Sequence, residues 1–135
     1  RLIIVLYGIG DHMAAKTRSL VAFAHVTDVE RTIKFYSDLG FEVSNIVVPD
    51  GQITPIWAWL KSEKANLMVG LASESIDSSQ QAVLFYLYYD NLKQTHAALV
   101  ELGYQCGEIK YPLYMPGGEF RLEDPDGYVL MLAQV

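Results

Sequence analysis

Few residues of this sequence could do chemistry. Three histidines and one cysteine occur among the 135 residues, and the sequence contains no glycine-rich phosphate motif, nucleophile elbow or paired-cysteine zinc motif. His25 stands near the end of an apolar run, where it could hydrogen-bond a ligand or transfer a proton. The alternative is a structural histidine that bonds to the backbone. The sequence leaves both interpretations open.

Aromatic side chains are better candidates for contact with a ligand. They make up 12% of the chain, and several recur two residues apart in predicted strands, where such residues share one face. The pairs on common faces are Phe23 with His25, Trp57 with Trp59, and Tyr86 with Tyr88. These rings suit stacking on a ligand, but packing in a core or between subunits would use them equally well.

A loop rich in aromatic, proline and glycine residues, 111–118, precedes the last predicted hairpin. Tyr114 and Met115 could cover a cleft there, although the segment could also be an ordinary connection. Glu119, directly after the loop, could supply negative charge to a cation, whereas carboxylates at a surface are usually only solvated.

The composition is that of an acidic globular domain. With 51% hydrophobic and 19% charged residues the chain is not disordered, and 135 residues suffice for one domain with a core. The formal net charge of -6 argues against nucleic acid as a partner and mildly favours cationic or neutral partners. No segment reaches the length of a transmembrane helix, so we expect no membrane partner. The single cysteine, Cys106, forms no internal disulfide, which favours a cytoplasmic location.

The first residues differ from the rest. Arg1 is not a start residue, Met13 opens a plausible natural beginning, and the pair His12-Met13 is typical of a cloning junction. We expect residues 1–12 to be a leader left by cloning, with a native origin as the alternative, and residues 13–135 to form a single domain.

The elements that must position these side chains occur in one order, twice. The first half predicts a strand at 20–26, a helix that opens with the capping-box pattern at 27–30 and ends at Gly40, and strands at 41–48, 53–60 and 67–71. A polar, serine-rich linker follows at 73–81. The second half predicts a strand at 83–89, a helix capped by Asp90 or Asn91 that ends at Gly103, and strands at 104–109, 120–122 and 128–133.

The two halves superpose when Gly40 is placed on Gly103, an offset of 63 residues, which also brings Phe41 onto Tyr104. This indicates an internal duplication, with module one at about 19–72 and module two at about 82–135. Neither half alone would bury a sizeable core, so the modules must pack together or exchange with another chain.

Several short motifs stand in a characteristic order over residues 19–134. They are Val26-Thr27-Asp28-Val29-Glu30-Arg31-Thr32, Phe35-Tyr36, Leu39-Gly40-Phe41, Leu67-Met68-Val69 and Asp124-Pro125-Asp126-Gly127-Tyr128-Val129-Leu130. In this order the chain resembles the vicinal oxygen chelate superfamily, which includes glyoxalase I, extradiol dioxygenases and bleomycin-resistance proteins. The resemblance implies an α+β fold of two βαβββ modules whose curled mixed sheets surround a cleft.

The resemblance also implies four cleft positions that hold His, Gln or Glu in the metal-binding members. Here these positions carry Val21, Gly70, Leu84 and Met131. None of them offers a hard oxygen or an imidazole nitrogen, so we expect neither metal nor other cofactor.

The chain therefore resembles most the metal-independent bleomycin-resistance type, which implies a homodimer that sequesters a small molecule in crevices between subunits. We predict binding of an aromatic or cationic compound without catalysis, with antibiotic resistance as the implied role. The alternatives are a glyoxalase- or dioxygenase-type lyase, isomerase or oxygenase, a metal-free enzyme with His25 or a glutamate as base, and a protein that only associates. The predicted ligand-binding residues are Val21, Phe23, His25, Trp57, Trp59, Gly70, Leu84, Tyr86, Tyr88, Tyr114, Glu119 and Met131.

Overall fold

The first sheet contains four strands and carries one helix. The computed structural model describes residues 15–135, so the predicted leader at 1–12 lies outside the described residues. The sheet has the order β1-β4-β3-β2, with β1 parallel to β4 and the other pairs antiparallel. Its elements are β1 (Ala22–Val26), α1 (Val29–Ser37), β2 (Glu42–Val47), β3 (Trp57–Ser62) and β4 (Ala65–Leu71).

The second sheet repeats this plan with one strand fewer. Its order is β5-β7-β6, with β5 parallel to β7, and a short 3-10 turn at Ser78–Gln80 lies in the linker before it. Its elements are β5 (Phe85–Tyr89), α2 (Leu92–Glu101), β6 (Glu119–Glu123) and β7 (Val129–Gln134). The predicted α+β fold of two similar modules is confirmed, and neither sheet closes into a barrel.

The strand predicted at 104–109 is wrong as a regular element. The Gly107 amide donates to the Arg121 carbonyl at 2.9 Å, while Lys110 and Glu119 exchange two backbone hydrogen bonds. Pairing 107 with 121 and 110 with 119 shifts the register by one residue between the two contacts. The segment therefore lies beside β6 with an irregular register and contributes only an isolated bridge.

The helix boundaries follow local chemistry. Asp28, and not Thr27, caps α1, because its carboxylate accepts the amide of Arg31 at 3.1 Å. Asn91 caps α2 in the same way. The predicted glycine stops are confirmed, since Gly40 and Gly103 have φ angles of +100° and +95°. Glycine adopts this left-handed conformation without strain.

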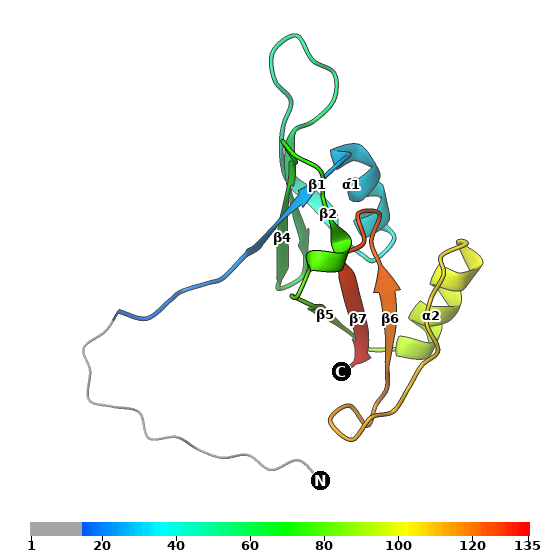
Figure 1. The fold of residues 1–135 in the computed structure, drawn as a ribbon. Coiled ribbons are helices and arrows are strands. Elements are labelled where there is room, and N and C mark those ends of the chain that lie inside the picture. The colour runs from blue at the N-terminus through cyan, green and yellow to red at the C-terminus, as the bar shows by residue number, and fades with distance from the viewer. Residues whose placement is uncertain (1–14) are drawn as a thin grey trace.

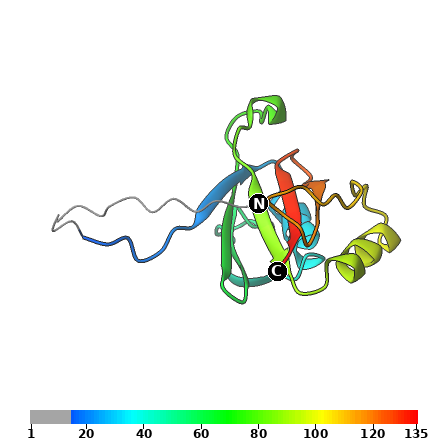
Figure 2. The ribbon, with the colours of Figure 1, turned by 90° about the horizontal axis from the view of Figure 1, so that it is seen from below.

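One core joins the two modules. Alternate residues of both sheets point into it, among them Val26, Val69 and Leu130, and both helices contribute buried side chains. A buried hydrogen bond from the Tyr36 hydroxyl to Asp124, 2.9 Å long, also links the modules. Figures 1 and 2 show the sheets side by side, with α2 at the outer edge of the second. Because the core occupies one face of each sheet, the other face of each is open to solvent.

Candidate functional site

The open face of the first sheet carries two rows of side chains. The strand register places Phe23, Met68 and Trp59 in one row. It places His25, Gly70 and Trp57 in the next row. Ala24 and Val26, which alternate with these residues in β1, are buried, whereas Phe23 and His25 are exposed. The predicted grouping of Phe23 with His25 on one face therefore matches the structure.

Gly70 makes room for the ring of Phe23. A Cβ atom built on Gly70 would lie 2.5 Å from Cζ of Phe23, far inside contact distance. The ring therefore leans over the backbone of β4, and its centroid is 5.0 Å from that of His25. The absence of a side chain at residue 70 lets the tip of the aromatic ring approach the sheet closely.

The two tryptophans occupy the same open face and are half-buried. Their rings stand 6.5 Å apart in an edge-to-face arrangement. The indole N–H of Trp59 donates to the side-chain oxygen of Asn66 at 2.9 Å, which fixes the orientation of this ring. The residues of β3 that alternate with the tryptophans, Ala58 and Leu60, belong to the core.

The open face of the second sheet has the same layout with other side chains. Tyr86, Met131 and Arg121 form one row. Tyr88, Ala133 and Glu119 form the next row. Tyr86 and Tyr88 are 39% and 58% exposed, and their rings are stacked with centroids 6.2 Å apart. These tyrosines present polarisable faces to solvent, as a site for stacking requires.

Glu119 is buried, so its interpretation as a merely solvated carboxylate is wrong. The residue is only 5% exposed, although Tyr88 and Arg121 on the same face are exposed. The hydroxyl of Tyr86 reaches across from β5 and donates to the carboxylate of Glu119 at 3.3 Å. Burial, the charge of Glu119 and the neighbouring Tyr114 raise the pKa of Tyr86 to about 12. Tyr114 itself is exposed on the preceding loop.

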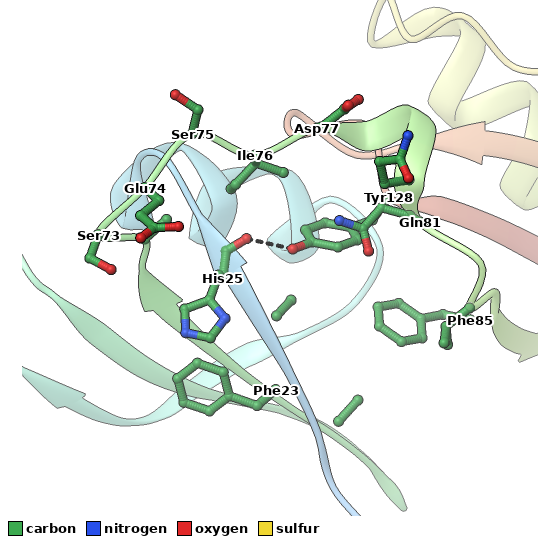
Figure 3. Close-up of a pocket in the computed structure, with 15 residues that line it drawn as sticks. Phe23, His25, Ser73, Glu74, Ser75, Ile76, Asp77, Gln81, Phe85 and Tyr128 are labelled. Carbon is green, nitrogen blue, oxygen red and sulfur yellow. Dashed lines mark hydrogen bonds between the residues drawn. The ribbon is translucent and has the colours of Figure 1, made fainter.

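A pocket of about 700 Å³ opens between β1 and the linker. Phe23 and His25 project into it from β1, with Phe85 and Tyr128 on its other side and Glu74 on the linker (Figure 3). The Tyr128 hydroxyl donates to the backbone carbonyl of His25 at 2.7 Å. Sequence reasoning missed the linker residues of this pocket, because a polar, serine-rich stretch carries no signal beyond that of a connection.

The predicted aromatic residues do not meet in one cleft within a single chain. Tyr86 and Tyr88 line a second pocket, of about 450 Å³, together with the turn between β3 and β4. Trp57 and Trp59 line neither pocket. The reason is architectural: the two sheets share a core on one side, so their open faces point away from it separately.

The four positions that the resemblance identifies with the metal ligands of other members all lie on or beside the open faces. Val21 and Leu84 directly precede β1 and β5, Gly70 lies under Phe23, and Met131 lies between Tyr86 and Arg121. Gly70 and Met131 are not equivalent, because the register aligns Met131 with Met68 and Gly70 with Ala133.

Met68 and Ala133, the residues aligned with Met131 and Gly70, likewise offer no hard oxygen or imidazole nitrogen. Within residues 15–135, no three His, Cys, Asp or Glu side chains are grouped so that they could hold a metal ion. The donor set does not fit a metal centre. No helix in the same part of the chain is long and apolar enough to cross a membrane.

Comparison with known proteins identifies the family to which the chain belongs. The family model described as "Glyoxalase/Bleomycin resistance protein/Dioxygenase superfamily" matches residues 12–132. The chain belongs to this superfamily. No curated protein matches its sequence.

Three solved structures have a fold similar to that of this chain. A bleomycin-binding protein complexed with bleomycin has 22% identity and a TM-score of 0.67, with 88% of this chain and 99% of that chain covered. An antibiotic binding protein from Streptomyces sp. CB03234 has the same identity and TM-score, with coverages of 91% and 98%. A glyoxalase-related enzyme from Clostridium phytofermentans has 13% identity and a TM-score of 0.71, with coverages of 91% and 98%. At these identities the likeness concerns the fold.

Proposed function

We propose that this superfamily member binds an aromatic or cationic small molecule without a metal and without catalysis, as bleomycin-resistance proteins do. The observation that carries the proposal is the pair of open sheet faces, which present aromatic rings and one buried carboxylate but no cluster of metal-binding groups within residues 15–135. Ligand pockets are typically built this way, from aromatic walls with a few placed polar groups.

We further propose that the working form is a cytoplasmic homodimer in which a second copy covers both open faces. Phe23 is 46% exposed and Tyr88 is 58% exposed in the single chain. Apolar surface of this kind in a soluble domain typically marks an interface or a binding groove. Light scattering during gel filtration should give twice the 15.2 kDa mass of one chain, whereas a monomeric mass would contradict this part of the proposal.

Intrinsic fluorescence tests binding directly, because both tryptophans lie on one open face. The protein would be titrated with bleomycin, 1-naphthylmethylamine (cationic at neutral pH) and its neutral analogue 1-naphthylmethanol. Saturable quenching by at least one compound is expected. No response to any of them in fluorescence or calorimetry would contradict the proposal and favour a protein that only associates.

A matched pair of variants locates the site. Tyr88→Ala removes a ring from the open face of the second sheet, and Tyr111→Ala removes an equally exposed ring outside the predicted site. Tyr88→Ala should weaken binding roughly tenfold, since stacking contributes about 1–1.5 kcal/mol, and Tyr111→Ala should leave it unchanged. Equal effects of the two variants would argue against the sheet face as the site.

The glyoxalase- or dioxygenase-type enzyme remains the second candidate, because a glyoxalase-related enzyme shares the fold. Elemental analysis of protein purified without chelators separates the two. A stoichiometric divalent metal would overturn the metal-free proposal, and substoichiometric traces would support it.

A further inference from the structure

Glu119 presents a buried carboxylate without a cationic partner among the described residues. The ion pairs within residues 15–135 join Arg31 to Asp126, Lys34 to Asp38 and Arg121 to Glu123, and none of them includes Glu119. A carboxylate withdrawn from water normally requires a cation or several hydrogen-bond donors. Here its side-chain donor is the hydroxyl of Tyr86, at 3.3 Å.

The two basic residues that lie beside Glu119 in the sheet form no ion pair with it. Arg121 lies two residues along the same strand face, but its guanidinium pairs with Glu123 at 3.0 Å. Lys110 lies opposite Glu119 in the isolated bridge, where the two residues exchange backbone hydrogen bonds. Its exposed side chain forms no ion pair with Glu119.

The surroundings of the carboxylate suit a cation. The stacked rings of Tyr86 and Tyr88 stand on the same face, and Ala133 between Tyr88 and Glu119 has only a methyl side chain. Aromatic faces attract cations, and the attraction strengthens when water is excluded. Tyr114 lies near Tyr86 on the loop before β6 and adds a further phenol.

We infer that Glu119, Tyr86 and Tyr88 form a subsite for the cationic group of the ligand, specifically an ammonium or amidinium that carries N–H donors. This inference rests on the proposed function and deepens it by naming the chemistry of one end of the ligand. An ionised carboxylate has about four acceptor sites, of which Tyr86 uses one, so an N–H cation gains charge-assisted hydrogen bonds that a quaternary ammonium cannot make.

The test compares two matched probes on three proteins. The probes are 1-naphthylmethylamine and 1-naphthylmethanol, which differ by a charged and a neutral head group of similar size. The proteins are the wild type, Glu119→Gln, and the control Glu108→Gln, which removes the same charge from an exposed side chain that forms no ion pair within residues 15–135. Dissociation constants come from calorimetry at neutral pH, and circular dichroism checks that each variant folds.

The wild type and Glu108→Gln should bind the amine roughly 10- to 100-fold more tightly than the alcohol, the range expected for a charge-assisted hydrogen bond. Glu119→Gln should lose this preference and keep its affinity for the alcohol. Tyr86→Phe, which frees the carboxylate, should retain the preference, so the inference stays testable if Glu119→Gln does not fold. The trimethylammonium analogue of the amine should bind more weakly than the amine.

Failure of the cation subsite and failure of the proposed function would give different results. Equal binding of amine and alcohol by the wild type would refute the cation subsite and leave the proposed function standing. Binding of neither compound, nor of bleomycin, would refute the proposed function itself. If Glu119→Gln weakens the dimer and leaves the preference for the amine intact, the carboxylate pairs with a basic residue of a second copy, and the subsite is refuted.

Discussion

Replacing Gly70 with alanine tests whether the ring of Phe23 lies on the sheet beside the candidate site. The new Cβ atom would stand 2.5 Å from Cζ and 2.9 Å from Cε1 of that ring. Ordinary contact begins at 3.4 Å, so the ring edge must retreat by about 1 Å. The backbone itself is no obstacle, because Ala133 occupies the equivalent position of β7.

The size of the effect follows from two opposed contributions. A side chain pushed about 30° from its rotamer loses roughly 0.5–1.5 kcal/mol, and Phe23 has room to move because it is 46% exposed. Alanine in a strand interior is about 0.5–1 kcal/mol more favourable than glycine. Gly70→Ala should therefore change the free energy of unfolding by less than about 1 kcal/mol, despite the severe apparent clash.

Urea denaturation of four proteins isolates the ring as the cause. In a Phe23→Ala background only the strand contribution remains, so Gly70→Ala should stabilise that protein by about 0.5–1 kcal/mol. The difference between the two backgrounds measures the coupling between residues 23 and 70. Identical effects in both backgrounds would refute the reasoning, as would a loss above about 3 kcal/mol in both, because either result would locate the clash elsewhere.

Three further predictions concern polar contacts. Tyr36→Phe removes the donor to buried Asp124 and should lower the free energy of unfolding by about 1.5–3 kcal/mol in urea, whereas Tyr104→Phe, at a partly exposed carboxylate, should cost less than about 1 kcal/mol. Burial raises the pKa of Tyr36 above its unfolded value of 10.0, so its stabilisation is complete below pH 10 and is lost as the pH rises further. The deficit of Tyr36→Phe should accordingly shrink between pH 9 and pH 11, and a constant deficit would contradict this. Asn66→Ala should cost about 0.5–1.5 kcal/mol and shift the tryptophan emission, with a smaller cost when Trp59 is already phenylalanine.

The sequence predicted those features that depend on neighbours in the chain. Alternation correctly grouped Phe23 with His25 and Tyr86 with Tyr88, because side chains two residues apart in a strand share one face. The helix ends at Gly40 and Gly103 were equally predictable from the sequence, because a positive φ angle at a helix end strongly favours glycine.

The sequence could not predict features that depend on distant parts of the chain. The hydrogen bond to Glu119 from Tyr86, 33 residues earlier, crosses from one strand to another, and strand periodicity does not predict such a contact. The pocket beside His25 depends on the path of the linker, which a polar composition does not determine. The irregular segment at 104–109 depends on a register slip against β6, which only the hydrogen-bond pattern shows.

The registers also show how the two modules differ. Phe23 and Met68 correspond to Tyr86 and Met131, and the shift from 68 to 131 repeats the offset of 63 seen between the glycine stops. In the adjoining strands, Trp59 stands opposite Met68. In the second sheet Arg121 stands opposite Met131, the counterpart of Met68, so Arg121 corresponds to Trp59. In the same way Trp57 corresponds to Glu119, so indoles on one face are replaced by charged groups on the other.

This replacement bears on the kind of ligand. In the proposed dimer a second copy covers both open faces. If the first face of one subunit meets the second face of its partner, each crevice has an indole side and a carboxylate side. A molecule with an aromatic body and a cationic end would then use both. Trp59→Phe should weaken the naphthyl amine and the naphthyl alcohol alike, because both stack, whereas Glu119→Gln should weaken only the amine. If both variants weaken binding of the amine alone, the indole face also recognises charge. The proposal that one sheet binds the aromatic body and the other the cationic end would then be refuted.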